Sequence, residues 1–156
     1  MKVELKENQK IKLAQAKELY KVMQEILFRE DEFRRKQEFF WVVGLSSCSR
    51  IEFVELIALG KLNAVNVEPR EIFSYAFQTR CFRLILVHNH PSGNLAPSMQ
   101  DLMMTERVIE ASLILNVEIV DHMIITETDY TSFSGYVKVF YEKNKKKVRR
   151  VLYTNF

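Results

Sequence analysis

Apolar residues near the N-terminus recur at steps of three and four, the spacing of one face of a helix. This stripe lies between charged positions and consists of Leu13, Ala16, Leu19, Tyr20, Met23, Ile26 and Leu27. No glycine or proline precedes Gly44, so nothing in the sequence interrupts the helix. We expect residues 1–35 to form an amphipathic helix that packs on the rest of its own domain. A dimerisation arm is the alternative role.

From Glu38 the pattern changes to runs that are typical of strands. Residues 39–43 are aromatic and β-branched, and residues 51–57 alternate apolar and acidic side chains. The polar link 46–50 between the two runs predicts a hairpin loop. The alternation places Glu52 and Glu55 on a solvent-facing side of the second strand.

Further along the chain, expected helices alternate with expected strands. Pro69 predicts the start of one helix, in which Glu71 is a first-turn carboxylate favoured by the helix dipole. The other expected elements are a strand that ends at His88, a helix from Ser98 to about Leu115, strands at Val117–Thr126 and Tyr130–Phe133, and a final hairpin that pairs Val137–Tyr141 with Val148–Tyr153. This order predicts a mixed α/β fold, with a largely antiparallel sheet flanked by helices, over residues 36–156.

Composition is that of a single enzyme-sized domain. The chain has 156 residues, of which 47% are hydrophobic, enough for one sizeable core. No apolar run approaches the roughly 20 residues that a membrane span needs, and residues 1–6 lack a signal region. We therefore expect a cytoplasmic protein without membrane contact. Cys48 and Cys81 show no ligand spacing, and we expect both to be buried small hydrophobes rather than a disulfide.

The formal net charge of +3 is too small to indicate a nucleic-acid partner. A basic cluster, Lys145–Arg150, does occur near the C-terminus and could bind phosphates weakly through counterion release. A solvated turn or tail is the favoured interpretation, because no aromatic residues are interleaved with these charges to stack on bases.

The segment after the apolar run 84–87 carries the chemistry. Successive strand side chains point to opposite faces, so His88 and His90 point the same way and can bind one cation. The turn residues 91–97 and a helix start at Ser98 then bring Asp101 back toward the two imidazoles. Two nitrogens and one oxygen leave a zinc ion a fourth position for water, which is the catalytic arrangement.

Each part of this motif has a simpler explanation when taken alone. A histidine pair at a strand end is more often packing or surface, and Ser98-x-x-Asp101 is a common capping box. The joint occurrence of the parts in this order and spacing favours a metal site.

The same residues resemble a known family. His88-x-His90, seven residues, then Ser98-x-x-Asp101 is similar to the JAMM signature of JAB/MPN metallopeptidases, and His-Asn-His-Pro-Ser-Gly resembles the RadC branch. Flanking segments that share the resemblance are residues 60–63, 69–73, 120–125 and 130–133, so that it covers about residues 36 to 135. The resemblance implies a JAB/MPN fold of cytidine-deaminase-like architecture and a zinc-dependent hydrolase.

The resemblance also implies roles for single residues. In the JAMM pattern a glutamate at the start of an early strand is the general base, and Glu38 is the matching position. Ser98 is placed to donate to the oxyanion of a peptide or isopeptide amide in a peptide or protein substrate. Asn89 and Ser92 are candidate substrate or supporting contacts, and His122 is first a structural strand residue and second a neighbour of the active site.

Two other functions stay open at this point. Two histidines and one carboxylate also form the facial triad of non-haem iron oxygenases, although that triad does not need Glu38 or Ser98. RadC-like proteins are also associated with DNA repair and recombination, where the fold would act as a metal- and DNA-binding module.

Overall fold

The sheet of this protein has six strands, and the metal-motif histidines lie at the end of a central one. The computed structural model describes residues 1–60 and 67–154, with side chains up to residue 145. The strands are β1 (Lys2–Val3), β2 (Glu38–Leu45), β3 (Ile51–Gly60), β4 (Arg83–Asn89), β5 (Glu118–Ile125) and β6 (Tyr130–Ser132), in the spatial order β1-β3-β2-β4-β5-β6. Among the strand pairs of the described residues, β4–β5 alone is parallel. The predicted mixed, largely antiparallel fold is thereby confirmed.

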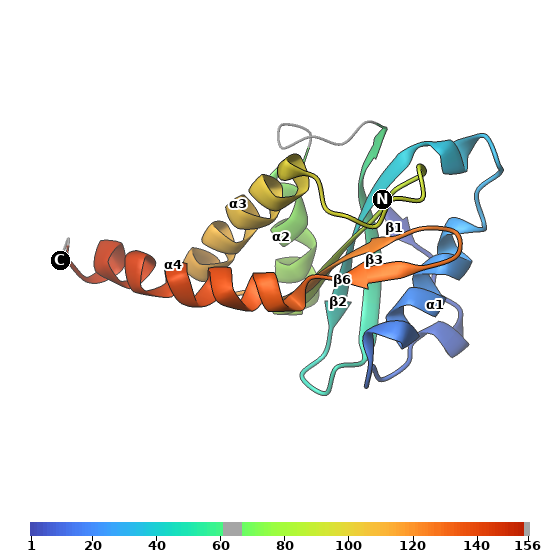
Figure 1. Cartoon of the computed structure of the whole chain (residues 1–156). Coiled ribbons are helices and arrows are strands. Elements are labelled where there is room, and N and C mark those ends of the chain that lie inside the picture. Colours follow the sequence, from blue (N-terminus) through green and yellow to red (C-terminus); the bar gives the residue numbers. More distant parts are fainter. Residues whose placement is uncertain (61–66, 155–156) are drawn as a thin grey trace.

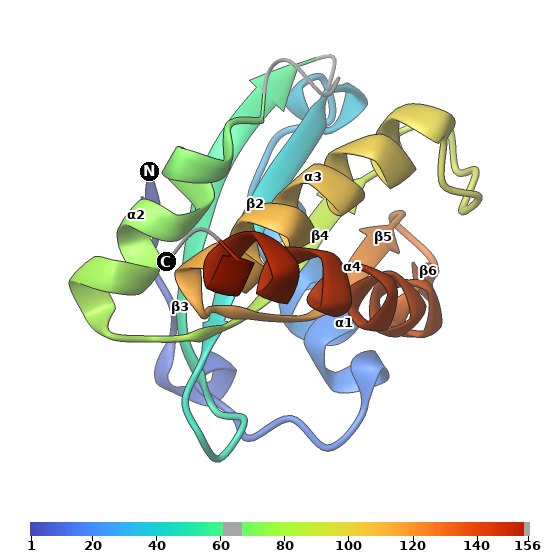
Figure 2. The same ribbon diagram turned by 90° about the vertical axis from the view of Figure 1, so that its left-hand side faces the viewer.

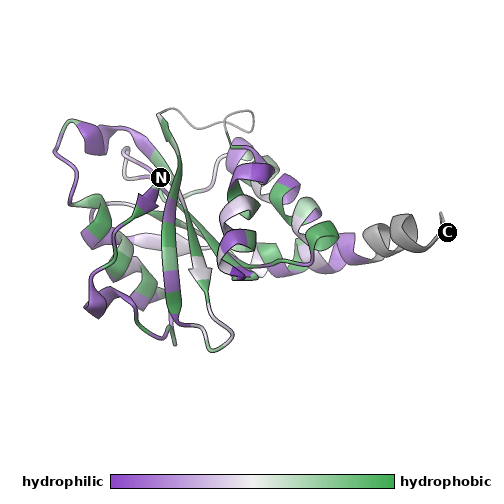
Figure 3. Cartoon of the chain, turned by 180° about the vertical axis from the view of Figure 1, so that it is seen from behind, coloured by the Kyte–Doolittle hydropathy of each residue, from purple (hydrophilic) through white to green (hydrophobic). Residues whose placement is uncertain are grey.

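Helices cover both faces of the sheet (Figures 1 and 2). The main helices are α1 (Ala16–Leu27), α2 (Pro69–Thr79), α3 (Met99–Leu115) and α4 (Ser134–Thr154), and short 3-10 turns occupy Glu7–Gln9 and Arg34–Lys36. Alternate residues of the strands serve the two layers. Phe40 and Val42 of β2 face the core under α2 and α3, whereas Trp41 and Val43 face α1. The helix expected over residues 1–35 is confined to Ala16–Leu27, because residues 2–3 pair with β3 as β1. The apolar side of α1 is buried, and polar positions occupy the rest of that helix (Figure 3).

The predicted C-terminal hairpin is wrong, because residues 134–154 form one helix. Val137 is buried, and Phe140 and Tyr141 pack on the same core as α3. These three residues recur at helical spacing, so one helix buries them together. In Figure 1, α4 runs away from the sheet toward the C-terminus. The side chains of 146–150 in the predicted basic cluster, and residues 61–63 of the flanking motif 60–63, lie outside the described residues.

Two smaller expectations also need correction. Cys81 is buried as predicted, but Cys48 is exposed, since it lies in the turn between β2 and β3. Glu52 is exposed, whereas the side chain of Glu55 is only 12% exposed, because β1 adds to the edge of β3 at that residue. Within the described part of the chain, no helix is both long and apolar enough to cross a membrane.

Asp121 joins β5 to β6 on the face opposite the metal motif. Its carboxylate accepts the backbone N–H of His122 at 2.7 Å and the Ser132 hydroxyl at 2.5 Å. The residue is 7% exposed, and this burial raises the pKa of the carboxyl to about 6, against 3.8 for the ordinary side chain. Between about pH 4 and 6 the folded chain therefore holds a proton that the unfolded chain has released.

We predict that Asp121→Asn removes one pH-dependent contribution to stability. The protonated Asp121 carboxyl should stabilise the wild type relative to the variant by up to about 3 kcal/mol at about pH 4, and this contribution should be lost as pH rises to about 6 and should not return above that window. The neutral amide has no such dependence, so the variant should gain on the wild type across the window. Denaturant unfolding of both proteins in chelator measures this, and a difference that is constant with pH would contradict it.

Candidate metal centre

His88 and His90 are presented by β4, at the point where its pairing with β2 stops. Leu84 and Leu86 share the α3-facing core, and His88 continues their alternation with 1% of its surface exposed. The last β2–β4 partners are Phe40 and His88. His90 lies one residue beyond β4, and its backbone N–H donates to the Ile125 carbonyl of β5 at 2.9 Å. Both rings are thus fixed by the centre of the sheet.

The third side chain comes from the first turn of α3. Ser98 is the N-cap of this helix: its Oγ accepts the Asp101 backbone N–H at 3.1 Å, and the Asp101 carboxylate accepts the Ser98 backbone N–H at 2.7 Å. The Ser98 hydroxyl also donates to Asp101 Oδ2 at 2.7 Å. The capping box is therefore present, and it aims the carboxylate of Asp101 at the two histidines.

The three side chains converge on one point. Asp101 Oδ1 lies 3.3 Å from His88 Nε2, Asp101 Oδ2 lies 3.3 Å from His90 Nε2, and the two Nε2 atoms are 2.9 Å apart. Donors about 2.0–2.1 Å from a tetrahedral zinc are themselves about 3.3 to 3.4 Å apart. The two nitrogens and one oxygen therefore fit a small divalent cation, and the group could bind such an ion.

Electrostatics keep the carboxylate charged. Burial of Asp101 opposes its ionisation, but the hydrogen bonds from His88, His90 and Ser98 outweigh burial and hold the pKa well below its usual range. The hydrogen bond to Asp101 raises the pKa of His90, burial opposes this, and the Asn94 carbonyl and the Glu38 charge add to the rise. The same negative groups that favour a proton on the His90 ring would also favour a metal cation beside it.

A buried polar chain stands behind His88. The Thr105 hydroxyl donates to the Asp101 carbonyl at 2.6 Å, so its oxygen is left to accept the Nδ1–H of His122, also at 2.6 Å. His122 Nε2 then accepts the Nδ1–H of His88 at 2.8 Å. Burial first, and the neighbouring His88 second, hold the pKa of His122 well below its ordinary value, so this ring is neutral.

This chain of hydrogen bonds sets the tautomer of His88. With Nδ1 engaged by His122, His88 directs Nε2 toward Asp101 and His90. His90 is oriented in a similar way, since its Nδ1 lies 2.6 Å from the Asn94 carbonyl. Metal-binding histidines commonly donate their other ring N–H to such an acceptor.

Glu38 begins β2 and belongs to the face that carries His88. Phe40 lies opposite His88 in the β2–β4 ladder, and Glu38 is two residues before Phe40, so the alternation of the strand puts both on that face. The Glu38 charge contributes to the raised pKa of His90, as expected for a nearby carboxylate. Residues separated by about fifty positions in the sequence therefore meet at one end of the sheet.

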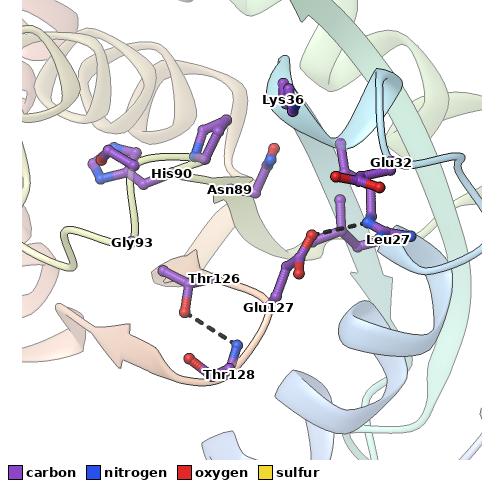
Figure 4. A pocket seen from close by; sticks show the side chains of 12 residues that line it. Leu27, Glu32, Lys36, Asn89, His90, Gly93, Thr126, Glu127 and Thr128 are labelled. Atoms are coloured by element: carbon purple, nitrogen blue, oxygen red, sulfur yellow. Dashed lines mark hydrogen bonds and ion pairs between the residues drawn. The ribbon is translucent and has the colours of Figure 1, made fainter.

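A cleft of about 380 Å³ lies beside the His90 edge of this group. Its walls come from the segment after α1, from the turn after β4 and from the β5–β6 turn (Figure 4). Arg35 and Glu127 form an ion pair of 2.8 Å in one wall. The residues around the cleft are Leu27, Glu32, Arg35, Lys36, Asn89, His90, Pro91, Ser92, Gly93, Thr126, Glu127 and Thr128. Ser92 lies here, whereas Ser98 does not line this cleft.

Two polar residues of the site were missed or ranked low from the sequence. Thr105 was given no role, although it stands one helical turn after Asp101 and so lies on the same face of α3. His122, expected to be a structural strand residue first and an active-site neighbour second, contacts His88 directly through its ring. The parallel pairing of β4 with β5, which brings the two together, is a long-range feature that local patterns do not report.

Comparison with known proteins gives a consistent result. A family model described as a RadC-like JAB domain matches residues 13–138. A UPF0758 protein of Desulforudis audaxviator is 44% identical over 96 residues, which cover 62% of this chain and 42% of the relative. A UPF0758 protein of Methanosarcina mazei is 37% identical over 134 residues, which cover 85% of this chain and 56% of the relative. The chain thus spans about half the length of the curated relatives it matches.

We predict that Thr105→Val weakens metal binding without removing a ligand. Valine keeps the shape but cannot accept the Nδ1–H of His122, so the tautomer of His88 is no longer set. Zinc affinity should fall by about 10- to 100-fold, measured by competition with a chromophoric chelator. Ser112→Ala is the control, because it removes another fully buried α3 hydroxyl far from the histidines. Equal zinc affinities for wild type and Thr105→Val would contradict the role given to the hydrogen bonds that link Thr105, His122 and His88.

Proposed function

The chain belongs to the RadC-like JAB domain family, and from this premise we propose that it is a zinc-dependent hydrolase of the JAMM type. Its reaction would be the attack of water on a peptide or isopeptide amide. The observation that carries the proposal is the convergence of two imidazole nitrogens and one ionised carboxylate at 2.9–3.3 Å. The chemistry of this donor set suits zinc, and its three members leave room for a fourth ligand.

His88, His90 and Asp101 would hold the metal. When bound, zinc supplies a Lewis acid and lowers the pKa of water toward neutrality. The protein's own contribution is to keep the ligands in the right protonation state. Asp101 stays ionised, and His88 directs Nε2 to the site because its other nitrogen is engaged by His122.

Glu38 would act as the general base. Its carboxylate accepts a proton from the attacking water and passes it to the nitrogen of the leaving amine. The position of Glu38 on the His88 face of the sheet supports this role. The cleft beside His90 offers space for the chain of a peptide or protein substrate.

Ser98 would stabilise the oxyanion of the tetrahedral intermediate. Its hydroxyl donates to Asp101 Oδ2 in this structure, so it has to turn from that oxygen to the substrate. The Ser98 backbone N–H still donates to the same carboxylate oxygen after such a turn. Asp101 therefore keeps one partner while the hydroxyl changes its own.

Hydrolysis accounts for more of the site than the other functions considered. An iron oxygenase would need the triad but would leave Glu38 and Ser98 without a task. DNA binding depends on the basic cluster, most of whose side chains lie outside the described residues. That binding, the cytoplasmic location and the division at residue 36 stay predictions from the sequence.

We predict that His90→Ala abolishes stoichiometric zinc binding while the chain stays folded. The side chain is 13% exposed and lies beyond the end of β4, so its loss leaves the apolar layers intact. Elemental analysis of the purified variant measures the metal, and circular dichroism checks the fold. A full zinc equivalent in a folded variant would show that the assigned ligands are wrong.

We predict that Glu38→Gln keeps zinc and loses turnover. Glutamine preserves size but cannot accept the proton, so cleavage should fall by about 100- to 10,000-fold. Cleavage is measured by mass spectrometry on a library of peptides and branched isopeptides with the zinc-loaded protein. Glu52→Gln is the matched control, because Glu52 is an exposed carboxylate on the neighbouring strand. Unchanged turnover in Glu38→Gln would assign the base to another residue.

A further inference from the structure

Asn89 stands between two metal ligands in the sequence, yet its side chain is turned to a different strand. It is 1% exposed, and it lies beside His90 at the end of β4 (Figure 4). Its Oδ1 accepts the backbone N–H of Phe39 at 2.6 Å, and its Nδ2 donates to the backbone carbonyl of Gln37 at 3.0 Å. The one amide group therefore binds the main chain on both sides of Glu38.

These contacts take the place of backbone pairing between β2 and β4, which stops just before this point. The β2–β4 ladder ends at the pair Phe40–His88, whereas the β4–β5 ladder continues to the pair Asn89–Ile125. β4 thus stays bonded to β5 through the His90 N–H and the Ile125 carbonyl, while the side chain of Asn89 bonds to β2. On its β3 side, Glu38 is paired with Gly60. The amide supplies the support on the β4 side that the ladder no longer gives.

We infer that Asn89 is a positioning residue that fixes Glu38 relative to the metal ligands. A side chain of two rotatable bonds links the residue between His88 and His90 to the peptide groups that flank the base. A shift of β2 against β4 would break both of its hydrogen bonds. The Asn89 amide therefore restrains the distance between Glu38 and the pair His88 and His90. This inference rests on the proposed function for the role of Glu38, but the contact itself does not.

The first test measures the contact in metal-free protein. In Asn89→Ala the Phe39 amide loses its acceptor, so its hydrogen exchange should become about 10- to 100-fold faster relative to the amides of Val42 and Val43. The control Ser112→Ala removes an equally buried polar group elsewhere and should leave that ratio unchanged. If Asn89→Ala does not fold, Asn89→Asp replaces it: the acceptor for Phe39 remains and the donor to Gln37 is lost, so exchange at Glu38 should rise and exchange at Phe39 should not. An unchanged exchange pattern in the folded variant overturns the inference.

The second test asks whether Asn89 acts through Glu38. Zinc affinity in Asn89→Ala should stay within about threefold of wild type, because none of the three ligands is removed. On any peptide that the wild type cleaves, kcat should fall by about 100-fold with little change in KM, as expected for a displaced base. In the Glu38→Gln background the same substitution should cost nothing more. A full further loss in that background would show that Asn89 contacts substrate directly, which overturns the inference.

Failure of the proposed function has a different signature. If Glu38→Gln leaves turnover unchanged, Glu38 is not the base, and the inferred role of Asn89 fails with it. The exchange of the Phe39 amide would still change in Asn89→Ala, since that contact does not depend on any reaction.

Discussion

The interaction on which the site depends is that between the Asp101 carboxylate and the two imidazoles of His88 and His90. A buried carboxylate is costly unless charged or polar partners compensate it. Asp101 obtains that compensation from both histidines and from the Ser98 cap, which is why it remains ionised despite burial. The same contacts hold the first turn of α3 against the end of β4. The start of α3, the end of β4 and the group of His88, His90 and Asp101 are therefore held together by the same contacts.

Around this carboxylate, polar groups penetrate a layer that is otherwise apolar. Thr105 and His122 are fully buried next to Phe40, and every polar atom in their chain has a partner. A satisfied chain of this kind orders its members in one direction, because a single hydroxyl proton on Thr105 decides which nitrogen of each ring carries hydrogen. The orientation of His88 is thus set by hydrogen bonds that begin at the Asp101 carbonyl in the backbone of α3. Apolar residues of the same size would fill the space but could not orient His88.

The sequence predicted best what is local. His88, His90, Ser98 and Asp101 span fourteen positions, and the periods of strand and helix suffice to bring them together. Glu38 could be chosen over other glutamates only through the family resemblance, because β2–β4 pairing is not written in local patterns. The role of His122 depends on β5 lying parallel to β4, and no single-residue preference reports that. The error at residues 134–154 came from valines that favour strands, whereas burial of Val137, Phe140 and Tyr141 at helical spacing decided for a helix.

The separation of these residues along the chain has a consequence for the entropy that assembling the site costs. The donor set closes a segment of fourteen residues, whereas Glu38 must be brought to it across about fifty. The entropy of loop closure differs between the two by about 1 kcal/mol, and the longer closure also requires the antiparallel pairing of β2 with β4. The shorter closure therefore costs less entropy than the one that brings Glu38 to the same end of the sheet. Both closures depend on β4 taking its place in the sheet, so the short-range and the long-range parts of the site share one structural requirement.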